Sequence, residues 1–192
     1  MRITGGNAAR RILQVPKGLA VRPTPDLVKQ AVFNSLGERV IGARVLELFA
    51  GSGALSLECL SRGAASVMCV ELSHKHAEFI RRNAELAASP FGALDVRVQD
   101  VFVLLPQLVT NGTTFDLILA DPPYGEKNVE RRSTSFTQRL LDDSTLPKLL
   151  APGGRFILGH ARRDTLEITT QWIEVKTLKH GDSLMRFLER AA

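Results

Sequence analysis

A short acidic turn at the end of an apolar run carries the most chemical information in this chain. Asp121-Pro122-Pro123-Tyr124 follows residues 115–120, whose apolar side chains predict a buried strand that the two prolines end. A residue before proline is held extended, so Asp121 is oriented at the carboxyl end of that strand, where ligands bind in open α/β sheets. Carbonyl acceptors and a flat ring suit a nucleobase whose exocyclic amino group donates hydrogen bonds while its face stacks. The alternative is a plain strand-ending turn.

A glycine turn that follows an earlier strand predicts a cofactor site. The segment Leu48-Phe49-Ala50-Gly51-Ser52-Gly53 opens a helix, where glycines let the backbone approach a ligand and free N–H groups are available. Glu71 ends the next predicted strand, 18 residues after Gly53. That spacing suits a carboxylate that accepts both ribose hydroxyls of an adenosine, with Leu72 beside it. The alternative for Glu71 is a surface acid at a strand end.

Three further features distinguish among nucleotide cofactors. Ser56 occupies the place of the third glycine in the dinucleotide fingerprint, which argues against a nicotinamide-dependent oxidoreductase, and no Lys-Ser/Thr pair of a triphosphate loop follows. Glu47, just before the turn, would repel a pyrophosphate and tolerate a cation. An adenosine that carries a sulfonium and an amino acid fits these constraints, so the sequence predicts S-adenosylmethionine. Asp100 and the N–H of Val101, after the third strand, are placed to bind its adenine; the alternative is that Asp100 merely caps the next helix, and the two roles are compatible.

Strands and helices alternate along the chain. The predicted strands are residues 44–49, 66–71, 94–98, 115–120 and 155–158, followed by a hairpin over 171–179 and 183–189. The predicted helices begin at Thr24-Pro25, with Thr24 as the cap, and cover 54–62, the segment from Ser73 to before Pro90, 101–108 and 136–150. This order predicts an α/β fold with a single doubly wound, mostly parallel seven-stranded Rossmann-like sheet that ends in an antiparallel hairpin.

Composition describes an ordinary globular protein of 192 residues, 44% hydrophobic and 23% charged. We expect a cytoplasmic protein, because no stretch has the length to span a bilayer and the amino terminus lacks a signal peptide's apolar region. We expect a monomer, because no predicted helix shows a spare apolar face. Cys59 and Cys69 lie in apolar runs and are predicted to be buried free thiols. The four histidines have no metal-site spacing, and His74-Lys75-His76 reads as solvated helix surface.

The net charge of +5 comes from the amino-terminal segment. Residues 1–24 hold five basic side chains and no acid, and the remaining 20 basic and 20 acidic residues cancel. A neutral body with a basic, partly ordered arm over residues 1–23 suggests a polyanionic partner that contacts mainly the arm. Residues 24–192 would form the catalytic domain. The alternative is a basic tail that serves solubility. The candidate phosphate contacts are Arg10, Arg11, Lys17 and Arg22.

With these residues in place, the chain resembles, almost end to end, the small-subunit ribosomal RNA guanine-N2 methyltransferases, which act on a hairpin-loop guanine of bacterial 16S RNA. The most specific shared motifs are Arg22-Pro23-Thr24 with the helix after it and Leu60-Ser61-Arg62-Gly63-Ala64, beside the glycine turn, Glu71, Asn83 and residues 121–124. The chain departs from the family pattern at Glu47, where Asp is common, at Ala8-Ala9 in the arm, and at Gly159-His160, where we expect an acid.

The resemblance implies methyl transfer from S-adenosylmethionine to the N2 amine of a guanine in 16S ribosomal RNA, on an assembled small subunit or a late assembly intermediate. It implies a catalytic role for Asp121, Pro122, Pro123 and Tyr124 and a cofactor role for the turn and strand-end acids named above. Methylation of adenine N6 or of a protein glutamine uses the same turn, because both also present a conjugated amino group. A catalytically silent ribosome assembly factor is the remaining alternative.

Overall fold

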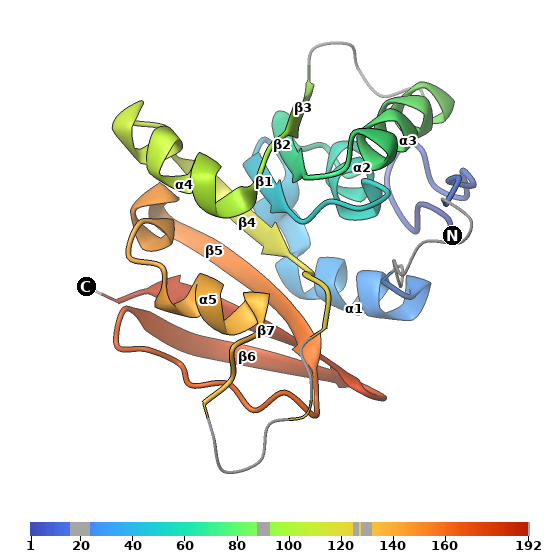
Figure 1. Cartoon of the computed structure of the whole chain (residues 1–192). Coiled ribbons are helices and arrows are strands. Elements are labelled where there is room, and N and C mark those ends of the chain that lie inside the picture. Colours follow the sequence, from blue (N-terminus) through green and yellow to red (C-terminus); the bar gives the residue numbers. More distant parts are fainter. Residues whose placement is uncertain (16–23, 88–92, 125–126, 128–131, 192) are drawn as a thin grey trace.

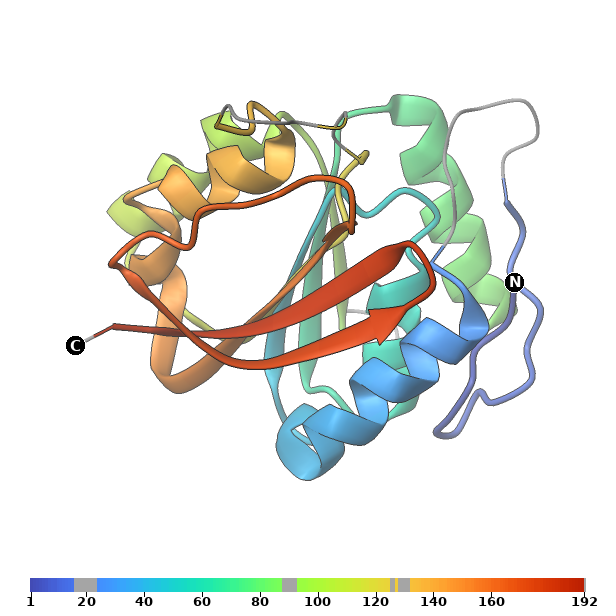
Figure 2. The ribbon, with the colours of Figure 1, turned by 90° about the horizontal axis from the view of Figure 1, so that it is seen from below.

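The computed structural model describes residues 1–15, 24–87, 93–124, 127 and 132–191. They form a seven-stranded sheet of order β3-β2-β1-β4-β5-β7-β6 with helices on both faces (Figures 1 and 2). The strands are β1 (Arg44–Leu48), β2 (Ser66–Glu71), β3 (Leu94–Val98), β4 (Phe115–Ala120), β5 (Leu150–Ala161), β6 (Trp172–His180) and β7 (Ser183–Arg190). The helices are α1 (Asp26–Leu36), α2 (Ala54–Ser61), α3 (His74–Leu86), α4 (Val101–Thr110) and α5 (Phe136–Asp142), with 3-10 turns η1 (Gly37–Val40) and η2 (Leu146–Leu149).

The strand directions confirm the predicted doubly wound sheet with its carboxyl-terminal hairpin. Neighbours among β1 to β5 are parallel, whereas β7 pairs antiparallel with both β5 and β6. The chain winds from β1 out to β3 and then returns to place β4 on the other side of β1. The order therefore reverses between β1 and β4, and such a switch point opens a crevice at the carboxyl edge of the sheet.

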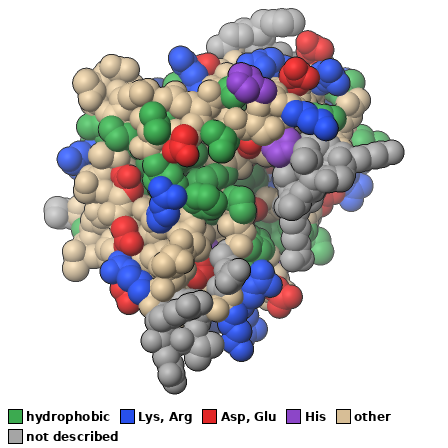
Figure 3. All heavy atoms as spheres, in the orientation of Figure 1, with side chains coloured by type: hydrophobic (Ala, Val, Ile, Leu, Met, Phe, Trp, Pro, Cys, Tyr) green, Lys and Arg blue, Asp and Glu red, His purple; other side chains and the backbone are tan. Residues whose placement is uncertain are grey.

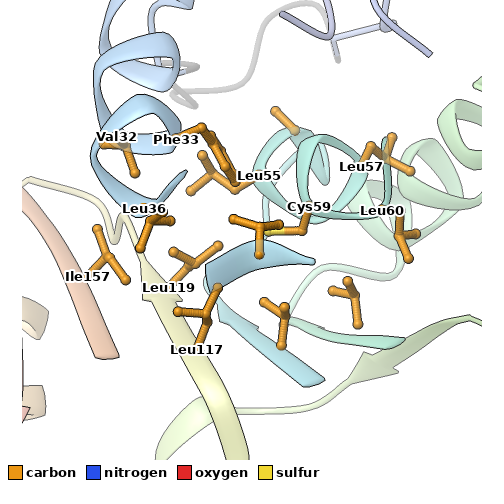
Figure 4. Packing of buried hydrophobic residues seen from close by; sticks show 14 of the residues in the cluster. Val32, Phe33, Leu36, Leu55, Leu57, Cys59, Leu60, Leu117, Leu119 and Ile157 are labelled. Carbon is orange, nitrogen blue, oxygen red and sulfur yellow. The ribbon is translucent and has the colours of Figure 1, made fainter. Parts of the chain in front are cut away.

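The central strands bury side chains on both faces, as their apolar runs predict. Val45 of β1 packs with α1 and α2, whereas Leu46 faces α4 and α5 because successive side chains alternate. On the first face, α1 brings Phe33 against Leu55 of α2 above the strand residue Leu119 (Figure 4). Both cysteines lie in the interior as free thiols, as predicted.

The first fifteen residues pack onto α1 and α2. Ile3 and Leu13 are buried in the same cluster as these helices, and Arg2 pairs with Ile12 in an antiparallel bridge. Glu58 of α2 accepts hydrogen bonds from the backbone N–H and the hydroxyl of Thr4, both at 2.8 Å. Residues 1–15 are therefore tied to the body of the protein, and Lys17 and Arg22 lie outside the described residues.

Three local predictions are wrong. Residues 136–150 form two short helices, because Asp143 follows α5 in an extended conformation and its carboxylate accepts from the N–H groups of Thr145 and Leu146. The fifth strand is longer than residues 155–158 and starts at Leu150, with an irregularity that absorbs the Pro-Gly-Gly segment 152–154. Thr24 makes no capping hydrogen bond to α1, whose N-cap is Pro25.

Candidate functional site

The registers of the sheet bring three sequence segments to one edge. Leu48 of β1 lies opposite both Val70 of β2 and Ala120 of β4. The chain continues from these paired residues into the glycine turn, Glu71 and Asp121 respectively, so the three segments leave the sheet side by side. The sequence could predict each strand end, but the pairing that aligns them is a property of the fold.

A cavity of about 650 Å³ lies at this edge, a size typical of small-molecule sites. In the orientation of Figure 3, hydrophobic side chains gather at the centre of the face, with charged side chains around them. The described lining includes Phe49 and Gly51, Glu71 and His76, all of residues 121–124, and Arg163 after β5. Three of the predicted cofactor residues, Phe49, Gly51 and Glu71, therefore share this cavity with the predicted acceptor turn, whereas the other predicted cofactor residues are not in its described lining. Among the described residues, no group of acids, histidines and cysteines could hold a metal ion.

The glycine turn is held open by backbone conformations that side chains rarely adopt. Gly51 and Gly53 have φ values of 57° and 74°, in the left-handed region that glycine tolerates. A Cβ on Gly53 would meet Ile80 of α3 at 2.9 Å, so this position is also too crowded for a side chain. Phe49 has φ 58°, unusual for a residue other than glycine, and such strain is typical of ligand sites.

Glu71 organises one side of the cavity. Its carboxylate accepts from the N–H of Gly51 at 2.8 Å and from the N–H of Ser73 at 2.9 Å. His76 approaches the same carboxylate, with Nδ1 3.2 Å from Oε1, and lines the cavity. The prediction that residues 74–76 are solvated helix surface is therefore wrong for His76. His76 lies in the first turn of α3, and no local sequence signal shows that this turn faces Glu71.

Glu47 is buried below the turn and does not line the cavity. Its carboxylate accepts hydrogen bonds from the backbone N–H of Ser56, at 2.8 Å, and from the hydroxyl of that residue. Burial raises the pKa of the Glu47 carboxyl to about 7, since the charged form loses its hydration. The Glu47 side chain thus ties the end of β1 to the first turn of α2.

The end of β3 places Asp100 at the start of α4. Its Oδ1 accepts from the N–H of Phe102 at 2.8 Å and from the N–H of Val103 at 3.2 Å, so Asp100 caps α4, a role that is compatible with the predicted contact to adenine. Val101 is buried and Leu72 is exposed. Phe102 stands edge-on to Phe49, with ring centroids 6.2 Å apart, and thereby joins α4 to the glycine turn.

The acidic turn contacts two distant parts of the chain. Thr24 donates its hydroxyl proton to Oδ2 of Asp121 at 2.6 Å, and the hydroxyls of Tyr124 and Ser183 lie 2.9 Å apart. The prolines between them line the cavity. Far from this turn in sequence, Arg10 and Arg11 are exposed on the amino-terminal segment, where Arg10 has φ 72°.

Comparison with known proteins supports the resemblance found in the sequence. The profile of the family described as Conserved hypothetical protein 95 matches residues 1–189. Ribosomal RNA small subunit methyltransferase D of Escherichia coli (strain K12) is 35% identical over 144 residues, or 75% of this chain and 68% of that protein. The solved structure of a hypothetical protein from Thermus thermophilus matches with a TM-score of 0.80 at 26% identity, over 98% of this chain and 99% of that one.

The match over nearly the whole length confirms the family and the fold predicted from the sequence. It also agrees with the geometry, in which a glycine turn, a strand-end acid and an Asp-Pro-Pro-Tyr turn share one cavity. The chain belongs to the family of small-subunit ribosomal RNA methyltransferases, which are class I enzymes that depend on S-adenosylmethionine.

Proposed function

We propose that this protein transfers the methyl group of S-adenosylmethionine to the exocyclic N2 of a guanine in 16S ribosomal RNA. The observation that carries the proposal is that Glu71 and Gly51 line the same cavity as Asp121 and Tyr124. A cofactor held by the first pair would face a base held by the second. The protein would act as a cytoplasmic monomer on the assembled small subunit or on a late assembly intermediate.

The cavity fits the proposed cofactor. Glu71 would accept from the ribose hydroxyls, and the strained turn at Phe49–Gly53 would let the backbone approach the cofactor closely. Leu72, Asp100 and Val101 would surround the adenine. When bound, S-adenosylmethionine supplies an electrophilic methyl group on a sulfonium. Glu47 would contribute through the α2 start that it supports, because its carboxylate is already bound to Ser56.

Asp121 and its prolines would prepare the acceptor amine. The lone pair of a guanine N2 is delocalised into the ring, so this amine is a poor nucleophile. The Asp121 carboxylate and the Pro122 carbonyl would accept from its two hydrogens, favour a pyramidal nitrogen and stabilise the positive charge that develops there. Asp121 would then accept the proton that nitrogen loses. Pro123 would keep the turn rigid, and Tyr124 would stack on the base, worth roughly 1–3 kcal/mol.

The basic amino-terminal segment would hold the RNA backbone. Arg10 and Arg11 are exposed side by side, and Lys17 and Arg22 follow in sequence. In this proposal residues 1–23 contribute phosphate contacts and residues 24–192 form the transferase domain. The target base must be unstacked to enter the cavity, which favours a loop or flipped nucleotide as the substrate.

The test is transfer of labelled methyl from S-adenosylmethionine to small ribosomal subunits from cells that lack this protein, followed by digestion to nucleosides. Label in N2-methylguanosine would support the proposal. Label in N6-methyladenosine or in protein glutamine would support the proposed cofactor site but show that guanine N2 is not the acceptor. Absence of label on naked RNA, on assembly intermediates and on subunits, with cofactor binding intact, would favour the silent assembly factor.

A further inference from the structure

The Asp121 carboxylate accepts a hydrogen bond from a residue near the amino terminus. Thr24 lies 97 residues earlier and donates to Oδ2 at 2.6 Å, a short hydrogen bond of the kind that carboxylates accept from hydroxyls. Thr24 is not needed to cap α1, because Pro25 is the N-cap and no side chain caps that helix. Its hydroxyl therefore has Asp121 as its observed partner.

A glycine on the neighbouring strand makes room for the other carboxylate oxygen. Gly159 lies in β5, opposite Met185 of β7, where the ladder fixes its backbone. A Cβ built on Gly159 would overlap Oδ1 of Asp121 and would lie 2.9 Å from its Cγ and 3.1 Å from the Met185 sulfur. The backbone of Gly159 is not in the left-handed region, so space, and not conformation, requires a glycine here. Residues 159–160 are also a departure from the family pattern, where an acid is expected, and the space beside Asp121 explains why this chain has a glycine at residue 159.

We propose that Thr24 and Gly159 are positioning residues that fix the rotamer of the Asp121 carboxylate, an inference that rests on the proposed role of Asp121. The Thr24 hydroxyl restrains Oδ2 through its hydrogen bond. Because Gly159 has no side chain, the space beside it is free for Oδ1. A carboxylate that is already oriented does not have to reorganise when the amine arrives, which is the main advantage of preorganised electrostatics. Thr24 is followed by Pro25, the N-cap of α1, so the hydrogen bond also connects the start of α1 to the acidic turn.

The variants Thr24→Val, Thr24→Ser and Gly159→Ala test this proposal. Valine keeps the branched shape of threonine without its hydroxyl, and serine keeps the hydroxyl. Thr145→Val is the matched control, because Thr145 also donates to an aspartate, Asp143, but in the loop between α5 and η2. Each variant is compared with wild type for kcat at saturating cofactor and subunit, for cofactor Kd and for Tm.

We expect Thr24→Val and Gly159→Ala each to lower kcat by roughly 10- to 100-fold, as small misplacements of catalytic groups do, with cofactor Kd within twofold of wild type. Thr24→Ser should recover most of kcat, and Thr145→Val should retain it. The double variant Thr24→Val/Gly159→Ala should lose less than the product of the single losses, because both changes act through one carboxylate. Unchanged kcat in both single variants, or a loss of cofactor affinity that matches the loss of kcat, would overturn the proposal.

The outcome is separable from that of the proposed function. If wild type methylates a different amino group, guanine N2 is wrong as the acceptor, and the same variants are then measured on the true one. Crystal structures of Thr24→Val and Gly159→Ala give a readout that needs no acceptor. A displaced Asp121 carboxylate in either would support the proposal, and the wild-type rotamer in both would overturn it.

Discussion

The carboxylate of Glu47 accepts hydrogen bonds from both the backbone N–H and the hydroxyl of Ser56, and both side chains are buried. Ser56 occupies the place of the third glycine in a dinucleotide fingerprint. Here its hydrogen bonds to Glu47 join the end of β1 to the first turn of α2. The two hydrogen bonds from Ser56 favour the charged carboxylate, but the loss of hydration on burial outweighs them and raises the pKa of Glu47 to about 7.

Glu47 should make the protein less stable as pH rises through the range between its unfolded and folded pKa values, 4.5 and about 7. In that range the folded state retains a proton that the unfolded state has released, so the free energy of unfolding falls with pH. Between those limits the loss is on the order of 3 kcal/mol. We expect Glu47→Gln to remove this dependence, as measured by urea unfolding from pH 4.5 to 8. Parallel pH profiles for wild type and variant would contradict the assignment.

Replacement of Asp121 by alanine should abolish methyl transfer while cofactor affinity stays within about threefold of wild type, because Asp121 is proposed to contact the acceptor and not the cofactor. Isothermal titration calorimetry with S-adenosylhomocysteine measures the affinity, and label incorporation measures transfer. Asp116→Ala is the control, since this aspartate lies on β4, the strand that Asp121 follows, but pairs with Arg44 at the opposite edge of the sheet. A large loss of cofactor affinity in Asp121→Ala would place Asp121 on the cofactor side.

Replacement of Glu71 by glutamine should have the reverse effect. The loss of a charged acceptor for the ribose and for the N–H of Gly51 should weaken cofactor binding by roughly 1–3 kcal/mol. Transfer at saturating cofactor should largely survive, so KM for S-adenosylmethionine rises more than kcat falls. Glu78→Gln on the exposed surface of α3 is the matched control and should leave both unchanged. Unaltered cofactor affinity in Glu71→Gln would remove Glu71 from the site.

The fold and the strand ends that form the cavity could be predicted from the sequence, but the contacts between distant residues in the cavity could not. Strand ends at Glu71 and Asp121 follow from apolar periodicity, glycines and prolines, which are local signals. The contact of Thr24 with Asp121 spans 97 residues, and the approach of Gly159 to the same carboxylate depends on the pairing of β4 with β5. No local pattern encodes such contacts. His76 was missed for a related reason, because a polar residue on a helix reads as exposed unless the element that it faces is known.

Lys29 should be critical for docking the amino-terminal segment. Its side chain is fully buried, donates to the carbonyl of Arg2 and forms ion pairs with Asp26 at 3.3 Å and with Glu58 at 3.8 Å. Lys29→Met removes both ion pairs and leaves the buried Glu58 carboxylate with its shorter pair to Arg62, so it should lower the free energy of unfolding by about 3 kcal/mol, the lower end of the range for broken buried pairs. Lys75→Met, at an exposed position on α3, should change it by less than about 0.5 kcal/mol. Equal effects of the two changes in urea unfolding would show that the buried pair does not stabilise the fold.

The exposed pair Arg10 and Arg11 should act on RNA affinity through charge alone. If each side chain neutralises one phosphate, the double alanine variant should weaken binding to the small subunit and reduce the slope of log K against log salt by nearly 2. The control is Arg39→Ala/Arg44→Ala, which removes two exposed arginines near the start of β1, at the edge of the sheet away from the cavity. Because residues 1–15 are packed on α1 and α2, the arginines present a fixed pair of charges, and their loss should change affinity without changing kcat at saturation. Equal salt slopes for wild type and both double variants would exclude residues 10 and 11 from the RNA contact.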